Sequence, residues 1–390
     1  MYLTKREERI YDGQQGWADQ VCIRILVRLG ELFGATRLIP IESAHISGVS
    51  YKTLGDAPSE FLQALANADG RVEVKATLNP QSFDPEHLRR RLSKRVWEKQ
   101  LNILKHFRKM GATMSFTCTP YYLEEPKPGA HLAWAESSAV VYANSVLGSW
   151  TNREGGPSAL AAAIIGKTPD YGIHRAENRK PQVHVEVKTS LQDEAEFGAL
   201  GIYLGKILKD KIPAIQGLQN LSETGLKQLG AGLATTGMAN MFHYNIQPEK
   251  AEIEKISVED KDLKHTLESL STTENKKADL IFIGCPHCSL TEIRQIATLM
   301  DGRKVKAGTE FWVCTSRYIR ERARDYVEKI ENCGGHVLTD MCTIASWTET
   351  LGIKTIMTNS AKTAYYAPTL NKAETILASS SKCLESALEE

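Results

Sequence analysis

Cysteine is the residue type in this sequence whose placement points most directly to chemistry. The closest pair, Cys285 and Cys288, follows an apolar run at residues 279–283 and Gly284, and it precedes a helical pattern at residues 290–300. The pair is therefore predicted to lie between the carboxyl end of a strand and the amino end of a helix, where open α/β sheets bind their ligands. Three further cysteines lie in or just after predicted strands, namely Cys118, Cys314 and Cys342.

These thiols allow more than one interpretation. Thiolates gathered from separate loops are typical of zinc sites and of iron–sulfur clusters. A structural zinc site usually shows two close pairs of cysteines, whereas here only one pair is close, and a ferredoxin-type run is absent. The spacing permits an iron–sulfur cluster with one iron open to substrate, and inert buried thiols are the alternative. The remaining cysteines, Cys22, Cys333 and Cys383, fall in helical patterns or at their ends.

Two loops in the first third have a composition suited to binding an anion. Residues 42–56 are rich in small and hydroxylic residues, and the amides around Gly48 are able to hold an oxyanion. Asn79 and Pro80 follow an alternating, strand-like pattern at residues 71–77. An ordinary turn before a predicted helix at residues 59–66 also explains the first loop, and the residues alone favour that simpler interpretation.

Two other features resemble phosphate sites but fit structural roles better. The glycine-rich residues 230–237 follow a helical stretch, lack the spacing of a dinucleotide fingerprint and lack a Walker lysine. The basic residues at positions 89–95 accompany a helical pattern over residues 86–110, which indicates a solvated helix surface. We expect a nucleotide site at neither position.

The elements predicted to position these residues alternate between helix and strand. A helical face at residues 9–33 precedes a strand at 38–41, and hydrophilic residues 248–277 are predicted to form a linker. In the last segment, strands at 279–283, 311–314, 336–339 and 354–357 alternate with helices at 290–300, at 318–332 and near the C-terminus, which predicts a parallel, doubly wound sheet. The predicted domains are residues 1–115, 116–277 and 278–390, all of them α/β.

Composition narrows the class of function. The chain has 390 residues with 48 basic and 47 acidic side chains, so it has no net field that would attract nucleic acid or an anionic membrane. Residues 1–9 lack the apolar core of a signal peptide, and the longest aliphatic block, residues 159–165, is too short to span a membrane. We expect a cytoplasmic enzyme whose cysteines are reduced, with no nucleic-acid or membrane partner.

Seven short motifs in a fixed order give a more specific expectation. They are His45-Ile-Ser-Gly-Val-Ser-Tyr51, Thr77-Leu-Asn-Pro80, Thr117-Cys-Thr-Pro-Tyr121, Trp134-Ala-Glu-Ser-Ser138, Gly284-Cys-Pro-His287, Thr339-Asp-Met-Cys342 and Thr358-Asn-Ser-Ala-Lys362. In these motifs, and over nearly its full length, the sequence resembles the large subunit of the aconitase X family. The resemblance implies an aconitase-like α/β fold, with three domains built on mostly parallel sheets around a central cluster site.

The resemblance also implies a set of site residues. An iron–sulfur cluster, 4Fe-4S with one iron open to substrate, would be held by Cys118, Cys285 and Cys342, whereas Cys288 would be either a bystander or a further ligand. The implied substrate contacts are Gly48, Val49, Ser50, Asn79, Pro80, Glu136, Ser137 and Lys362. For Lys362, an ordinary surface lysine is the alternative.

The activity implied by the resemblance is removal of water across C2 and C3 of (R)-5-phosphomevalonate, giving trans-anhydromevalonate 5-phosphate. The open iron would act as a Lewis acid on the tertiary hydroxyl, while a base removes the proton next to the carboxylate. That base is expected on a small swivelling-domain subunit, a separate polypeptide in the archaeal form of the family. Two alternatives are a dehydratase of another small hydroxy acid, such as cis-3-hydroxy-L-proline, and a non-catalytic thiol or zinc protein.

Overall fold

The structure is a computed structural model that describes residues 1–84, 86–88, 93–246, 253–273, 277–300 and 302–389. The chain divides into two compact units. Unit 1 comprises Met1–Ser82 and Leu92–Lys180, and unit 2 comprises Phe83–Arg91 and Pro181–Glu390. Among the described helices, none is long and apolar enough to cross a membrane.

Unit 1 is built on a three-stranded parallel sheet with the order β3-β2-β4. Its strands are β2 (Ser43–Ile46), β3 (Lys75–Leu78) and β4 (Leu132–Trp134). In the register of the sheet, His45 of β2 pairs with Thr77 on one side and with Trp134 on the other. An antiparallel pair joins β1 (Leu38–Pro40) to β5 (Lys167–Pro169). Because the three parallel strands point the same way, the residues that follow them gather at one edge of the sheet.

Helices supply most of the apolar core of unit 1. They are α1 (Lys5–Tyr11), α2 (Trp17–Leu32), α3 (Tyr51–Leu54), α4 (Asp56–Asn67), α5 (Lys94–Lys109), α6 (Ser137–Ser145) and α7 (Gly156–Ile165), with 3-10 turns at Pro120–Tyr122, Gly172–His174 and Ala176–Arg179. Helix α7 packs against α2 and β2, and its residues from Ser158 to Ile164 are all buried. An apolar sequence without a polar face suits a helix enclosed in this way.

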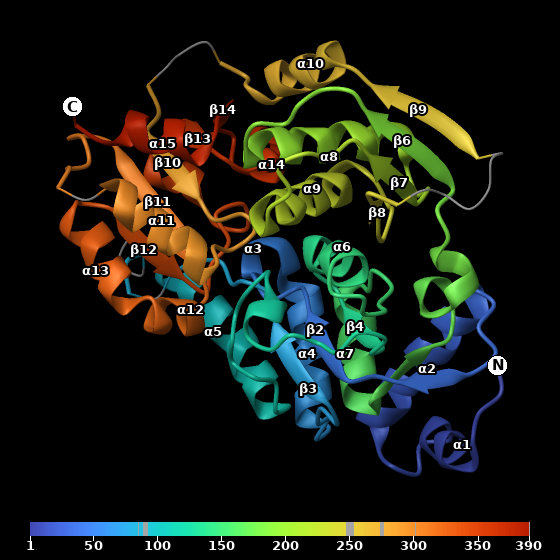
Figure 1. Ribbon diagram of the computed structural model, residues 1–390. Coiled ribbons are helices and arrows are strands. Elements are labelled where there is room, and N and C mark those ends of the chain that lie inside the picture. Colours follow the sequence, from blue (N-terminus) through green and yellow to red (C-terminus); the bar gives the residue numbers. More distant parts are fainter. Residues whose placement is uncertain (85, 89–92, 247–252, 274–276, 301, 390) are drawn as a thin grey trace. The chain divides into compact units, whose positions relative to one another are not determined.

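The first part of unit 2 holds a four-stranded parallel sheet with the order β8-β7-β6-β9. Its elements are β6 (Val183–Val187), α8 (Glu194–Leu208), β7 (Pro213–Gln216), α9 (Glu223–Thr236), β8 (His243–Tyr244), β9 (Glu254–Val258) and α10 (Asp260–Leu270). Helices α8 and α9 lie side by side (Figure 1). A Cβ at Gly232 would lie 2.2 Å from the carbonyl oxygen of Gly198, so the glycine-rich stretch serves close helix packing.

The second part of unit 2 is a five-stranded parallel sheet with the order β12-β11-β10-β13-β14. Its strands are β10 (Leu280–Ile283), β11 (Glu310–Thr315), β12 (His336–Thr339), β13 (Thr355–Thr358) and β14 (Glu374–Leu377). Its helices are α11 (Leu290–Met300), α12 (Arg317–Arg322), α13 (Arg324–Asn332), α14 (Ala361–Leu370) and α15 (Ser380–Ala387), with a 3-10 turn at Thr348–Leu351. The predicted parallel sheet is confirmed, with β14 as an additional strand.

Three segments differ from the sequence-based expectation. Residues 43–46, expected in a loop, form the central strand β2, because pairing on both sides outweighs their weak strand composition. Residues 248–277, expected to be a linker, contain β9 and α10, and residues 248–252 and 274–276 of this segment lie outside the described residues. The helix expected over 86–110 begins at Lys94, and residues 89–92 of its basic run also lie outside the described residues.

Candidate active site

The loop that follows β10 carries the first candidate thiol of unit 2. Gly284 ends the strand with a φ of 126°, a backbone conformation that side chains other than hydrogen disfavour. A Cβ at this position would lie 2.4 Å from the carbonyl oxygen of Cys314 on the neighbouring strand β11. Glycine is therefore required here, and the tight turn it makes brings Cys285 directly to the carboxyl edge of the sheet.

Hydrogen bonds from a helix and from neighbouring strands hold this loop. The amide of Gln228 on α9 donates to the Cys285 carbonyl at 3.2 Å. The backbone N–H of Cys288 donates to the Cys314 carbonyl at 2.9 Å, and the hydroxyl of Thr315 donates to the Cys288 carbonyl at 2.7 Å. The backbone of the loop is thus held by hydrogen bonds at both cysteines.

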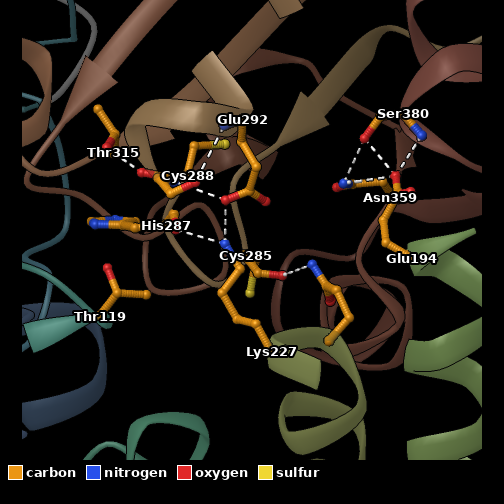
Figure 2. Close-up of polar contacts among 12 residues, drawn as sticks. Thr119, Glu194, Lys227, Cys285, His287, Cys288, Glu292, Thr315, Asn359 and Ser380 are labelled. Atoms are coloured by element: carbon orange, nitrogen blue, oxygen red, sulfur yellow. Dashed lines mark hydrogen bonds and ion pairs between the residues drawn. The ribbon is translucent and has the colours of Figure 1, made fainter. Parts of the chain in front are cut away.

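A buried ion pair lies against the same loop (Figure 2). The Lys227 Nζ atom is 2.5 Å from Glu292 Oε2, and only 1% and 9% of the two side chains are exposed. Lys227 also donates to the carbonyl of His287 at 3.1 Å, and Glu292 accepts from the backbone N–H of Ser289 at 2.8 Å. One charge pair therefore ties α9, the cysteine loop and the first turn of α11 together.

Burial separates the cysteines of this unit into two groups. Cys342, which follows β12, is partly exposed, and Cys285 is 8% exposed. Cys288 and Cys314 are 1% and 0% exposed, and burial raises the pKa of both thiols well above the ordinary value. A thiol that is kept protonated is a poor metal ligand. Cys333, at the end of α13, is also 8% exposed, so exposure alone does not identify the ligands in this unit.

Lys362 lies in the first turn of α14, just after β13, and is partly exposed. Strand β13 is adjacent to β10 in the sheet, and β12 lies one strand beyond β11 on the other side. Cys285, Cys342 and Lys362 thus all follow parallel strands of one sheet and share its carboxyl edge.

The corresponding edge of unit 1 gathers the other predicted residues. Gly48, with a φ of 78°, Val49 and Ser50 lie between β2 and α3, Asn79 and Pro80 follow β3, and Glu136 and Ser137 follow β4. The side-chain amide of Gln100 donates to the Val49 carbonyl at 2.8 Å, and the hydroxyls of Ser50 and Ser82 lie 2.6 Å apart. The predicted contacts of this unit are therefore brought together on one edge.

A chain of polar side chains runs through this edge. The Asn79 amide donates to Glu136 Oε2 at 2.8 Å, and the hydroxyl of Ser138 donates to Glu136 Oε1 at 2.9 Å. His45, which is fully buried, has its Nδ1 atom 2.7 Å from the hydroxyl of Thr77. Burial lowers the pKa of His45 to about 4, although the Glu136 carboxylate and Asn79 act in the opposite direction. His45 is thus neutral at physiological pH. It begins one of the quoted motifs, but neither its burial nor its pKa was predicted from the sequence.

Cys118 belongs to the same edge of unit 1. It follows Phe116, which forms a parallel bridge with Leu78 at the end of β3, and its side chain is partly exposed. Within the described part of each unit, no three His, Cys, Asp or Glu side chains are grouped so that they could hold a metal ion alone. Of the three predicted cluster ligands, Cys118 belongs to unit 1, and Cys285 and Cys342 belong to unit 2.

A separate cavity of about 660 Å³ in unit 2 lies at the amino ends of α8, α9 and α15 and against α11. On its wall, Glu194 accepts hydrogen bonds from the backbone N–H and the hydroxyl of Ser380 at 2.7 and 2.5 Å (Figure 2). The described lining includes Ile283 and Glu292 but none of the predicted site residues. This cavity and the predicted site residues are thus at different places in this unit.

Comparison with known proteins identifies the family of the chain. Residues 1–177, 181–268 and 278–389 match the first, second and third domains of aconitase X. The chain therefore belongs to the aconitase X family, and the predicted α/β fold with three domains is confirmed.

Individual relatives are similar over almost the whole chain. The phosphomevalonate dehydratase large subunit of Methanocaldococcus jannaschii is 47% identical over 395 residues, which are 96% of this chain and 97% of that protein. The crystal structure of Thermococcus kodakaraensis aconitase X in its holo form matches with a TM-score of 0.91 and 42% identity, over 99% of this chain and 100% of that chain. The cis-3-hydroxy-L-proline dehydratase of Pseudomonas aeruginosa is 32% identical, over 99% of this chain and 70% of that protein.

Proposed function

We propose that this chain is the large subunit of a phosphomevalonate dehydratase. It would remove water across C2 and C3 of (R)-5-phosphomevalonate and form trans-anhydromevalonate 5-phosphate, a step of the archaeal mevalonate route to isoprenoids. The observation that carries the proposal is the 43–47% identity to four large subunits of that name, over 94–99% of this chain. The hydroxyproline dehydratases are more distant, at 32–33% identity.

The proposed cofactor is a 4Fe-4S cluster with Cys118, Cys285 and Cys342 as ligands. Cys285 and Cys342 follow parallel strands of one sheet, and Cys118 follows the parallel bridge of Phe116 to Leu78. All three are more accessible than Cys22, Cys288 and Cys314, each of which is at most 1% exposed. Soft thiolates are the ligands that such clusters require, so the donor set fits the group. When bound, an iron with an open position supplies Lewis acidity toward the tertiary hydroxyl of the substrate. Cys288 is assigned to packing.

The chain's own polar residues are proposed to bind and orient the substrate. The backbone amides of Gly48, Val49 and Ser50 and the Lys362 ammonium supply donors for a phosphate and a carboxylate, the groups that carry the negative charge of phosphomevalonate. Asn79, Pro80, Glu136 and Ser137 complete the proposed contacts. The hydrogen bond from Asn79 fixes the Glu136 carboxylate at 2.8 Å, so this pair presents a defined arrangement to an oxygen-rich ligand.

The proposal includes a second polypeptide. The relatives from four organisms are named large subunits, which implies a smaller companion in each of those enzymes. We infer that this chain also acts with a small swivelling-domain subunit, which supplies the base that removes the C2 proton. The isolated chain should therefore fold and bind iron but show no turnover.

The test is a side-by-side assay of the anaerobically reconstituted two-subunit enzyme with phosphomevalonate, mevalonate and cis-3-hydroxy-L-proline. We expect turnover of phosphomevalonate, and a large loss without its phosphate, because remote binding energy contributes to the rate. Turnover of the proline derivative alone would move the function to the alternative. A colourless preparation with stoichiometric zinc would contradict the proposed iron–sulfur cluster. Full activity of the isolated chain would contradict the proposed need for a partner subunit.

A further inference from the structure

The two candidate thiols of unit 2 are connected through a buried histidine. His287 follows Cys285 by two residues, is 1% exposed, and has its Nε2 atom 2.8 Å from the carbonyl oxygen of Met341. Met341 directly precedes Cys342 and is itself fully buried. Because a carbonyl oxygen only accepts hydrogen bonds, Nε2 must carry the hydrogen, so this contact defines the tautomer of the ring.

The backbone of His287 is anchored independently of its ring. Its carbonyl accepts from Lys227 at 3.1 Å, and Lys227 is held by the buried carboxylate of Glu292 at 2.5 Å. The carbonyl of Cys285 accepts from Gln228, the next residue of α9. His287 therefore extends from a loop that α9 fixes, and its ring position follows from those contacts.

The loop of Cys342 is anchored from the other side. Asp84 accepts from the backbone N–H of Thr339 at 2.7 Å and from its hydroxyl at 3.1 Å, where β12 ends. Burial raises the pKa of Asp84, but hydrogen bonds from His87 and from the amides of Thr339 and His87 outweigh it and bring the pKa to about 2. With Asp84 holding Thr339 and His287 holding Met341, the chain is fixed on both residues that flank Asp340.

We propose that His287 is a positioning residue that sets the spacing of Cys285 and Cys342 before any metal binds. The inference rests on the proposed ligand assignment, since it concerns two of the three thiols. It also gives a structural reason for that assignment. Cys285 and Cys342 are 57 residues apart in the sequence, and one side-chain hydrogen bond joins their two loops. When a site is preorganised in this way, a smaller part of the binding free energy of the cluster is lost in ordering the chain.

The test uses thiol reactivity in the metal-free full chain, which needs neither cluster nor turnover. His287→Leu removes the donor at similar volume, and His287→Gln retains an amide N–H at the distance of Nε2. Mass spectrometry after timed iodoacetamide labelling would give rates for Cys285, Cys342 and the buried Cys383 of α15. We expect His287→Leu to raise the rates of Cys285 and Cys342 together, about fivefold or more, because a buried carbonyl loses its partner, and His287→Gln to stay near wild type.

Two results would overturn the proposal. If His287→Leu accelerated labelling of Cys285 but left Cys342 unchanged, the histidine would not join the loops. If Cys383 accelerated equally, the substitution would have loosened the whole unit. A second measurement uses reconstituted enzyme, in which iron loss to a chelator should be faster for His287→Leu than for His287→Gln at equal initial iron. Coupled labelling without phosphomevalonate turnover would refute the proposed function and leave this inference standing.

Discussion

The carboxyl edges of the three-stranded sheet in unit 1 and of the five-stranded sheet in unit 2 both carry predicted site residues, but their chemistry differs. In unit 1, the edge of β3-β2-β4 presents a neutral histidine hydrogen-bonded to Thr77, and an amide that donates a hydrogen bond to a carboxylate. In unit 2, the edge of the five-stranded sheet presents thiols on loops held by a buried lysine and glutamate. The first set suits an oxygen-rich ligand and the second a soft metal. Topology thus selects where a site forms, and the side chains select what it binds.

The largest expected effect concerns the thiols at both edges. Replacing Cys118, Cys285 or Cys342 by Ser should abolish iron binding and activity together, because a hydroxyl is a poor substitute for a thiolate toward iron. Iron analysis and the visible absorbance of the reconstituted chain measure this directly. Cys288→Ala, Cys22→Ser and Cys383→Ser serve as controls and should keep their iron. Wild-type iron content in Cys342→Ser would contradict the assignment of that residue.

Local periodicity was sufficient to predict the sheet of the last segment. Runs such as residues 280–283 are apolar throughout because β10 is buried on both faces, and the helix predicted at 290–300 has the bounds of α11. By contrast, β2 has only four residues, and its strand conformation depends on pairing with β3 and β4 on either side. Helix α10 buries only Leu263, Thr266 and Leu270, so its sequence looked like a linker.

The candidate site was predictable only in part. Glycine, cysteine and proline at strand ends mark the loops, and the family motifs named the residues within them. The ion pair between Lys227 and Glu292 spans 65 positions and the contact from His287 to Met341 spans 54, so no spacing rule reports either one. The neutral state of His45 could not be predicted for another reason. Its pKa is lowered by burial in β2, and that strand was not predicted from the sequence.

The next largest effect concerns stability and compares the buried ion pair of unit 2 with the neutral pair of His45 and Thr77 in unit 1. Lys227→Met should lower the free energy of unfolding by about 3–5 kcal/mol, because it leaves the Glu292 carboxylate buried without its cation. Denaturant titration of the metal-free chain measures the change. The double variant with Glu292→Gln should recover much of the loss. In unit 1, Thr77→Val removes a neutral partner of His45 and should lower stability by only about 1–2 kcal/mol. Equal losses at the two sites would contradict this distinction.

The pH dependence of stability should also differ between the edges. The folded-state pKa of His45, about 4, lies below the ordinary histidine value of 6.5, so the folded protein binds fewer protons than the unfolded chain between these values. Stability should fall as the pH drops from 6.5 to 4, by up to about 3 kcal/mol, and should not respond to this group above pH 6.5. In unit 2, Asp84 stays ionised over the same range, since its pKa is about 2. Burial raises the pKa of Asp340 to about 6, so the contribution of this group to stability rises, rather than falls, as the pH drops from 6 to 4.

Hydrogen exchange at pH 7 and pH 5 localises this effect. Protection of the β2 amides should decrease at the lower pH, whereas the Thr339 amide, which donates to Asp84, should keep its protection. His45→Gln removes the titrating group and should flatten the dependence in β2. A pH-independent β2 in the wild-type chain would show that His45 does not govern the stability of that edge.

The smallest predicted effect concerns the one cation among the proposed substrate contacts. Lys362 lies in the first turn of α14, at the thiol-bearing edge, so Lys362→Ala tests whether that edge also binds the substrate's charge. Loss of a charge-assisted hydrogen bond should reduce kcat/KM for phosphomevalonate roughly 10- to 100-fold. Lys362→Arg keeps the charge and should recover part of the activity. The cluster absorbance should be unchanged in both variants, because Lys362 is not a ligand. Wild-type kcat/KM in Lys362→Ala would assign all recognition of the anionic groups to other residues and sharpen the division between the two edges.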